Sequence, residues 1–424
     1  KRVTEVLDSW IEAGSASFAE RHFPFEKSEK LEDFFPPDFI AEYTGQIRAW
    51  FYVLHVIGAI LYESPAFKNV VVEGVILGTD GRKMSKNYGN YPDPKDLLEK
   101  YGGDALRLYL MSSPVVMGED MVISEESYRL QVRGMMLILW NVYNFFVTYA
   151  TADKFEARNS KFETSENVLD QWIVSLLNKL IQDVTESLKK YDTVFAIESI
   201  KKFIDDLSTW YIRRSRDRVG TSAENEEDKN AFYQTCYEVL TTLCKILAPI
   251  TPFLAEEMYI NLTGEESVHL TEWPIANKAL INKNIEREMV QARMVVEKAH
   301  AARKEAGIKV RQPLSSLATL TPVPLSETVS LIKDEVNVVD FENKKGDFYL
   351  SLDTNLTDEL IAAGKSRDII RQIQEERKKL GTSLAEKVNV TLPDWPEEFE
   401  NEIKKKALVQ NLEKGDKFSV SRVS

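Results

Sequence analysis

The chain has 424 residues, a formal net charge of −13, and 43% hydrophobic and 10% aromatic residues. This length accommodates two to four domains with separate cores, and the composition excludes a wholly disordered chain. The negative net charge argues against a surface largely covered by nucleic-acid-binding residues, although it is compatible with a local basic strip. No apolar run of membrane-spanning length is evident, so we expect a soluble protein with no membrane partner.

The first quarter of the chain mixes short strands and helices. Strands are predicted at 39–43 and 69–77, and the β-branched run of the second is typical of a strand buried on both faces. A helix is predicted at 46–62, and two later helices should be separated at Gly102-Gly103. Strands that alternate with helices predict half of a parallel sheet.

Long amphipathic helices follow, and together they predict a helical bundle. Apolar spacing places them at 125–149, 166–190, 198–218, 228–248 and 284–306. The clearest apolar stripe consists of Ile200, Phe203, Ile204, Leu207 and Tyr211. Two cysteines, Cys236 and Cys244, lie in one of these helices with no histidine nearby. We expect both to be buried thiols in a reducing cytoplasm rather than zinc ligands.

Beyond residue 313 the pattern predicts a small α+β domain without internal repeats. Its expected elements are strands near 316–321, 336–343, 348–353 and 388–392, and helices at 357–379 and after Pro396. We therefore expect three domains, at 1–120, 121–306 and 307–424.

A loop with the sequence "GRKMSKNYGNYPDP", residues 81–94, carries two lysines around a serine. Two ammonium groups on a glycine-flanked loop suit a ligand rich in negative charge, such as polyphosphate. The pentapeptide Lys83-Met84-Ser85-Lys86-Asn87 resembles the KMSKS signature of class I aminoacyl-tRNA synthetases.

Further segments are similar to motifs of the isoleucyl-tRNA synthetase family, in the same order along the chain. They are "LDSWIEAG" (7–14), "PPDFIAEYTGQIRAWFY" (36–52), "KNVVVEGVILGTDG" (68–81), "DDLSTWYIRRSRDR" (205–218) and "AGIKVRQPL" (306–314). The resemblance implies a multidomain α/β plus α fold: the second half of a Rossmann-type nucleotide-binding domain, a helical anticodon-binding bundle and a small α+β C-terminal domain. It also implies that isoleucine is attached to tRNA(Ile) through isoleucyl-adenylate, with ATP and Mg²⁺ as substrate.

The resemblance also implies how ATP is held. Lys83 and Lys86 are the expected catalytic residues, because mobile ammonium groups stabilise the charge that develops on the leaving pyrophosphate. Met84 and Ser85 complete the ATP-binding loop. Gly74 would let the adenine approach the backbone, and main-chain groups around Ile76 would bond it.

The amino-acid site is expected in the first two motifs. Trp10 and Trp50 match the aromatic walls of the family's aliphatic pocket, Glu42 would bind the α-ammonium and Gln46 would hydrogen-bond nearby. The same stretch departs from the family pattern at three positions: Tyr43 replaces a glycine, Gly45 an aspartate and Ala49 a glycine.

The tRNA surface is expected on the bundle despite the acidic total. Arg213 and Arg216 lie off the apolar stripe and are predicted phosphate contacts, whereas Arg214 and Arg218 continue the stripe and should pair with acids. A second basic patch is predicted from Arg303, Lys304, Lys309 and Arg311, of which Lys309 and Arg311 are the favoured tRNA contacts.

The second signature of the class, HIGH, is expected outside this chain. "HVIG" (55–58) lies within a helix rather than at a helix N-terminus after a strand, so His55 is expected to be a core or pocket-edge residue. We therefore expect a monomeric fragment that lacks the HIGH half and the editing domain and is inactive alone, with no zinc held by this segment. The alternatives are a fragment of a valyl, leucyl or methionyl synthetase, or a non-catalytic tRNA-binding module.

Overall fold

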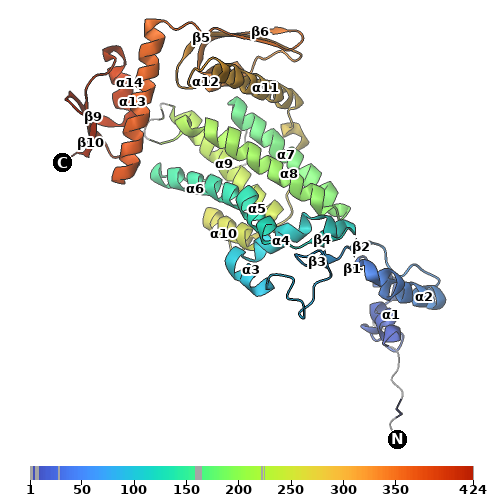
Figure 1. Ribbon diagram of the computed structural model, residues 1–424. Coiled ribbons are helices and arrows are strands. Elements are labelled where there is room, and N and C mark those ends of the chain that lie inside the picture. The colour runs from blue at the N-terminus through green and yellow to red at the C-terminus, as the bar shows by residue number, and fades with distance from the viewer. Residues whose placement is uncertain are drawn as a thin grey trace. The chain divides into compact units, whose positions relative to one another are not determined.

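The structure is a computed structural model that describes residues 3–4, 9–26, 29–157, 165–220, 223 and 225–423. Figure 1 shows its helices and strands. The chain forms two compact units, each assembled from three segments. The first comprises Lys1–Leu139, Leu180–Ile204 and Leu243–Pro274, and the second comprises Trp140–Lys179, Asp205–Thr242 and Ile275–Ser424.

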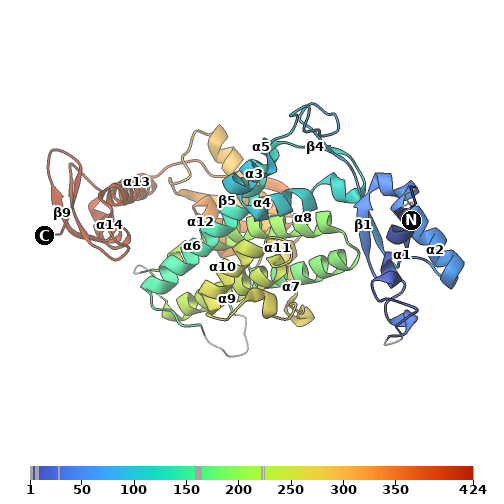
Figure 2. The ribbon, with the colours of Figure 1, turned by 90° about the horizontal axis from the view of Figure 1, so that it is seen from below.

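A parallel strand pair with two helices begins the first unit (Figure 1 and Figure 2). Strand β1 (Ile40–Tyr43) pairs with β2 (Val70–Glu73), and α2 (Trp50–Tyr62) connects them. Helix α1 (Trp10–Ala19) contacts α2 closely, since a Cβ at Gly14 would lie 2.6 Å from side-chain atoms of α2. The core of this region consists of Ile40, Phe51, Leu54 and Ala66.

The single strand predicted at 69–77 is wrong, because the chain leaves the sheet at Gly74. There the main-chain N–H of Gly74 donates to Val115 O at 2.7 Å, and that of Val75 donates to a carboxylate oxygen of Asp120 at 2.7 Å. The residues that follow form β3 (Ile76–Leu77), which pairs in parallel with β4 (Met121–Val122). Contacts with a distant part of the chain therefore divide this β-branched run between two sheets.

Two helices follow the lysine loop, as predicted. Helix α3 (Pro94–Tyr101) begins at a proline, and the Asp93 side chain caps it by accepting a hydrogen bond from the main-chain N–H of Lys95. It ends at Gly102, whose φ of 80° suits glycine, and α4 (Gly103–Met111) begins directly afterwards. The predicted break at the glycine pair is confirmed.

The bundle helices form where the apolar periodicity predicts them, except for the helix at 252–263, which was not predicted. They are α5 (Glu125–Gln131), α6 (Leu137–Ala152), α7 (Val168–Lys189), α8 (Thr193–Asp206), α9 (Glu226–Leu247), α10 (Pro252–Thr263) and α11 (Lys283–Glu305). All five residues of the predicted stripe are buried. Both cysteines are buried free thiols, as predicted, and burial raises the pKa of Cys244 to about 12.

One described helical stretch, Glu125–Ala152, is long and apolar enough to cross a membrane by length and composition. The sequence alone did not lead us to expect such a segment. Length and composition are weak grounds, since core helices of soluble proteins satisfy the same criteria. Met135, Leu139 and Val142 on this stretch are buried within the protein. The absence of a membrane partner remains a prediction.

The C-terminal region contains the same β-α-β-β arrangement twice, which corrects the expectation of no repeats. The first copy is β5 (Leu314–Thr321), α12 (Val329–Val336), β6 (Val338–Lys345) and β7 (Tyr349–Leu352). The second copy is β8 (Val388–Leu392), α14 (Glu400–Ala407), β9 (Val409–Lys414) and β10 (Ser419–Arg422). In each, the first strand is central, the second pairs with it in parallel and the third is antiparallel.

Details of the turns repeat as well. A left-handed residue, Asn337 or Leu408, ends each helix immediately before the next strand. In the turn after the second strand, a glycine N–H donates to the carbonyl of the last residue of the central strand. The bonds are Gly346 N–H to Thr321 O and Gly415 N–H to Leu392 O, both at 3.1 Å. Helix α13 (Asp358–Leu380) lies between the copies in sequence. The sequence signal that was overlooked is the Lys-Gly-Asp triplet at 345–347 and again at 414–416.

Candidate functional site

The lysine loop between β3 and α3 starts as a tight hairpin. Leu77 and Lys83 form an isolated antiparallel bridge, and the N–H of Gly78 donates to Arg82 O at 2.7 Å. Gly81 turns the chain at a φ of 75°, a conformation that favours glycine. Asp80 closes the turn by pairing with the Arg82 guanidinium at 2.7 Å.

The signature residues divide between the core and solvent. The Met84 side chain packs against a hydrophobic cluster that includes Leu97 and Tyr109. Lys83 and Lys86 are exposed, and in the described part of the chain neither ammonium has a recorded hydrogen bond or ion pair. The loop is thus attached to the core through Met84 and leaves two cations available to a ligand.

Ser85 organises the second half of the loop. Its carbonyl accepts hydrogen bonds from the N–H groups of Tyr88 and Gly89, both at 3.1 Å, and its hydroxyl oxygen accepts from Asn87 N–H at 3.3 Å. These bonds form a compact turn, so the chain around Lys86 is folded rather than extended.

Gly74 and Ile76 flank the break between β2 and β3. A Cβ at Gly74 would lie 1.9 Å from the carbonyl oxygen of Glu119, so packing of the main chain by itself requires glycine there. The expected reason for this glycine, close approach of a base, is therefore not needed to explain it. Ile76 is half-buried and pairs with Met121 in the β3–β4 ladder.

The residues expected around the amino acid lie on β1, α1, α2 and the turn before α2. Trp50 donates its indole N–H to Ala13 O at 2.9 Å, which links α2 to α1. Gln46 accepts the main-chain N–H of Trp50 at 3.2 Å, and half-buried Glu42 accepts that of Tyr43 at 3.0 Å. Trp10, at the first position of α1, is 39% exposed. Both tryptophans thus belong to the α1–α2 pair.

Two of the three departures from the family pattern lie against each other. A Cβ at Gly45 would lie 2.5 Å from the ring of Tyr43, so any side chain at position 45 would displace that ring. The tyrosine ring occupies the space beside residue 45, where the family has an aspartate.

Arg213 is more engaged than the sequence suggested. Its guanidinium pairs with Glu335 at 2.5 Å and donates to Thr209 O at 2.8 Å. Glu335 is 6% exposed and also pairs with Arg214 at 2.9 Å. Arg213 is exposed, as its position off the apolar stripe predicts, but it is also paired, because α12 supplies a buried acid that no helical projection of 198–218 contains. The predicted pairing of Arg214 with an acid is confirmed.

The other arginines of this segment differ in environment. Arg218 pairs with Asp170 at 2.7 Å and with Asp228 at 2.8 Å, which confirms its predicted structural role. Arg216 is exposed and lines a cavity of about 590 Å³. Lys378 and Lys406 contribute to the same cavity, so its wall carries several cations.

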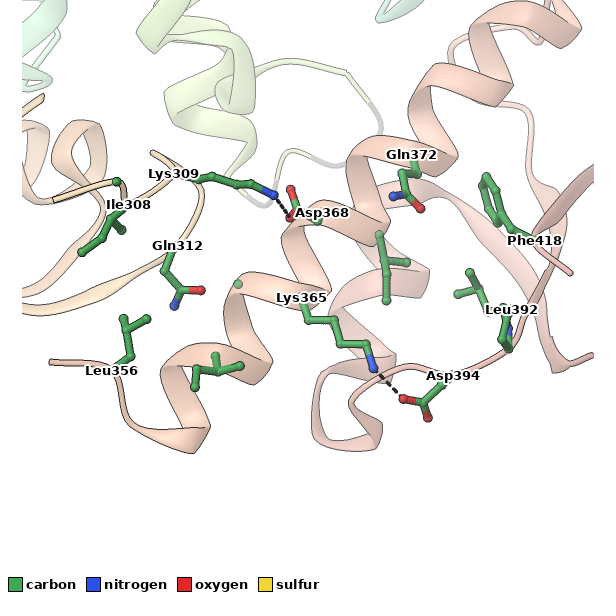
Figure 3. Close-up of a pocket in the computed structure, with 15 residues that line it drawn as sticks. Ile308, Lys309, Gln312, Leu356, Lys365, Asp368, Gln372, Leu392, Asp394 and Phe418 are labelled. Carbon is green, nitrogen blue, oxygen red and sulfur yellow. Dashed lines mark hydrogen bonds and ion pairs between the residues drawn. The ribbon is translucent and has the colours of Figure 1, made fainter. Parts of the chain in front are cut away.

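The second basic patch is only partly exposed. Arg303 is 1% exposed and donates to the carbonyls of Lys309, Gln312 and Asn337, so its assignment to a surface patch is wrong. Lys309 and Arg311 are exposed and both lie near Asp368, at 3.8 and 3.4 Å. Figure 3 shows Lys309 at the edge of a cavity of about 800 Å³ whose wall includes Leu356, Leu392 and Phe418.

The sequence predicts that His55 is not part of a HIGH signature and that this segment holds no zinc. His55 lies inside α2, away from a helix N-terminus, as predicted, but it is exposed, so its assignment to the core is wrong and a pocket edge stays a prediction. Among the residues that the structure describes, no group of three or more His, Cys, Asp and Glu side chains could hold a metal ion.

Sequence reasoning missed Asn90 and Glu335, two buried polar residues with several partners each. Asn90 stands in "GNYPDP", where a buried asparagine beside glycine is a recognisable turn signal. Glu335 belongs to a helix, α12, that was not predicted at all.

Comparison with known families and proteins agrees with the resemblance. Residues 1–124 match the family of tRNA synthetases class I (I, L, M and V), and residues 170–318 match the anticodon-binding domain of tRNA ligase. Similar curated proteins include the isoleucine–tRNA ligases of Leifsonia xyli (35% identical over 92% of this chain), Protochlamydia amoebophila (42% over 82%) and Chlamydia pneumoniae (44% over 80%). The chain spans 41%, 34% and 33% of these relatives.

Solved structures show the same fold. The agnB2 LeuRS of Agrobacterium radiobacter K84, in a complex with tRNA and LeuAMS, matches 99% of this chain and 42% of its own with a TM-score of 0.53 and 15% identity. A Mycobacterium tuberculosis methionyl-tRNA synthetase bound by methionyl-adenylate matches 65% of this chain and 52% of its own, with a TM-score of 0.51 and 19% identity. The chain belongs to the class I tRNA synthetases, and over most of its length it is related to isoleucine–tRNA ligases.

Proposed function

We propose that the protein containing this chain attaches isoleucine to tRNA(Ile) through isoleucyl-adenylate. The observation that carries the proposal is the lysine loop, where Met84 is packed in the core and Lys83 and Lys86 face solvent without partners in the described chain. The relatives named isoleucine–tRNA ligase support the choice of amino acid. Because the chain spans less than half of each, the activity is proposed for the whole protein.

The loop would act on ATP, with Mg²⁺ as part of the substrate. The isoleucine carboxylate attacks the α-phosphorus, and pyrophosphate leaves in line with it. Lys83 and Lys86 stabilise the charge that grows on this leaving group, and Ser85 holds the turn that carries them. Gly74, just before strand β3, and Ile76, the first residue of β3, are proposed to bind the adenine.

For the amino acid, the proposed walls are Trp10 and Trp50. Flat apolar rings favour a branched hydrocarbon side chain and disfavour polar ones, which would lose hydration without replacement. Glu42 supplies a half-buried carboxylate for the α-ammonium, with Gln46 beside it.

For tRNA, the proposed contacts are Arg216, Lys309 and Arg311, with Arg213 contributing from its ion pair. These cations would meet phosphates, whereas the net negative charge of the chain disfavours nucleic-acid contacts elsewhere on the surface. The proposal includes the division into domains at 1–120, 121–306 and 307–424, and a monomer in the cytoplasm.

The decisive experiment is isoleucine-dependent exchange of pyrophosphate into ATP by a complete synthetase that carries residues 1–424. Exchange with isoleucine, and much weaker exchange with valine, leucine or methionine, would support the proposal. Exchange with another of these amino acids would assign the chain to a different member of the class. Binding of tRNA without any exchange would indicate a non-catalytic module.

A further inference from the structure

Asn90 is a buried polar residue at the far end of the lysine loop. Its side chain is 8% exposed, and it lies just before α3, in the same loop as the signature residues. A buried amide is costly unless its donors and acceptor are all used. The partners of this amide therefore indicate what it holds in place.

The amide contacts both halves of the loop. Its NH₂ group donates to a carboxylate oxygen of Asp80 at 2.8 Å and to the carbonyl of Lys83 at 3.3 Å. Its oxygen accepts the main-chain N–H of Ser85 at 3.0 Å. One side chain thus bonds to the hairpin turn, to the first lysine of the signature and to the serine after it.

The main chain of Asn90 adds a second attachment. Its carbonyl accepts from the N–H of Thr79 at 2.7 Å and from the Thr79 hydroxyl at 3.2 Å. A Cβ at Gly78 would lie 2.4 Å from both the amide nitrogen and the carbonyl oxygen of Asn90. Glycine at position 78 is therefore what allows the asparagine to reach across the loop.

Asp80 shows the electrostatic effect of this contact. The hydrogen bond from Asn90, followed by that from the Arg82 N–H, lowers the pKa of Asp80 to about 2. The carboxylate stays charged and bonded to both partners at neutral pH, so the Asp80–Asn90 hydrogen bond stabilises both the hairpin turn and the orientation of Asn90.

We propose that Asn90 is a positioning residue that sets the main-chain geometry at Lys83 and Ser85 and so aims the loop's two ammonium groups at the polyphosphate. The inference rests on the proposed function. Asn90 does not touch substrate. It acts through the lysines, whose side chains remain free while their backbone is fixed. An error of about 1 Å in such a group costs on the order of 100-fold in rate.

The test uses a complete synthetase carrying this segment, assayed by isoleucine-dependent pyrophosphate exchange. We expect Asn90→Ala to lower kcat by about 10- to 100-fold, with KM for isoleucine and the melting temperature little changed. In a Lys83→Ala/Lys86→Ala background, which lacks both ammonium groups, the same substitution should lower kcat by less than about threefold, because residues that act as a unit are not additive.

Two further variants sharpen the result. Asn90→Asp keeps the acceptor for Ser85 N–H but loses both donated bonds and places a second carboxylate beside Asp80. It should therefore lower kcat at least as much as Asn90→Ala, with the same non-additivity. Asn355→Ala is the matched control, because the Asn355 amide also donates to a carboxylate, that of Asp353 at 2.9 Å, but outside the site. It should leave exchange unchanged.

The outcomes separate the inference from the function on which it rests. If the unsubstituted enzyme exchanges and Lys86→Ala impairs it, but Asn90→Ala and Asn90→Asp match the unsubstituted enzyme, only the inference is overturned. Equal losses in the presence and absence of both lysines would also overturn it, since Asn90 would then act independently of them. If the unsubstituted enzyme shows no exchange, the proposed function fails and the inference fails with it.

Discussion

Arg218 donates one hydrogen bond to each carboxylate oxygen of Asp170, both at 2.7 Å, and Asp170 is fully buried. The hydroxyl of Tyr211 donates to the same carboxylate at 2.8 Å. A planar guanidinium suits this two-point geometry, and the tyrosine occupies a further lone pair. The bundle therefore contains a buried ion pair in which both carboxylate oxygens of Asp170 accept hydrogen bonds.

Removing the acid of this centre should be strongly destabilising. Asp170→Ala leaves the guanidinium buried with Asp228 as its one remaining acid, and loss of one partner of a buried pair costs about 3–5 kcal/mol. We expect a clearly lower melting temperature by calorimetry. Asp228→Asn is the matched comparison, because Asp228 is 28% exposed and pairs with the same arginine. A smaller loss from Asp170→Ala than from Asp228→Asn would contradict this assignment.

The stability contributed by Glu335 should depend on pH. Burial opposes its ionisation, but the His300 ring at 3.8 Å, the contact with Arg213 and the charges of Arg213 and Arg214 lower the pKa of Glu335 from 4.5 to about 2. A lowered pKa stabilises the fold above pH 4.5, and that stabilisation is lost as pH falls towards 2. The full effect is on the order of 3 kcal/mol.

Glu335→Gln tests this directly. We expect the variant to melt well below the unsubstituted chain at pH 7, with the difference shrinking as pH is lowered towards 3. Exposed Glu342 on β6 provides the control, and Glu342→Gln should show no comparable pH-dependent difference. A constant gap between Glu335→Gln and the unsubstituted chain across this range would show that the carboxylate charge is not what stabilises the contact.

Lys86 should act on the rate of activation rather than on isoleucine binding. In a complete synthetase, Lys86→Ala is expected to lower the rate of adenylate formation by about 100-fold, which corresponds to a transition-state contact of roughly 3 kcal/mol. Isoleucine affinity should change little. Lys95→Ala, an exposed lysine on the next helix, should have no effect. Loss of isoleucine binding with normal turnover would show that the lysine is misassigned.

Arg213 and Arg216 should separate stability from tRNA binding. Arg216→Ala should weaken binding of tRNA(Ile) and reduce the slope of log K against log salt by about one, with the melting temperature unchanged. Arg213→Ala should weaken binding too but, unlike Arg216→Ala, should also lower the melting temperature, because it leaves Glu335 with one fewer partner. Lys179→Ala removes an exposed cation from α7 and should change neither quantity. An unchanged salt slope for Arg216→Ala would move the tRNA surface towards Lys309 and Arg311.

Local signals predicted much of the fold. The apolar stripe that includes Ile200 and Leu207 and the glycine pair at 102–103 depend on residues close in sequence, and both were interpreted correctly. The division at Gly74 depends on Glu119, and the environment of Arg213 depends on Glu335. No propensity or helical projection contains such distant partners, which is why the strand at 69–77 was predicted wrongly and the ion pair of Arg213 was not predicted.

The candidate site was predicted by motif rather than by periodicity. The positions of Lys83 and Lys86 followed from a short signature, and the structure adds that the backbone at Lys83 and Ser85 is hydrogen-bonded while both lysine side chains are exposed. The partners of Asn90 could not be anticipated, because they form only when Gly78 lets two stretches of the loop approach each other.

The twofold β-α-β-β arrangement has a consequence for aggregation. Because the first strand of each copy is central, every other strand is an edge, with unpaired main-chain groups open to another chain. The central strands β5 and β8 carry no charged residue, whereas edge strand β6 carries Asp340, Glu342, Lys344 and Lys345, and edge strand β9 carries Glu413 and Lys414. Charges on exposed edges discourage pairing between molecules. The edge strand without any charge, β7, is then where self-association of this chain would begin.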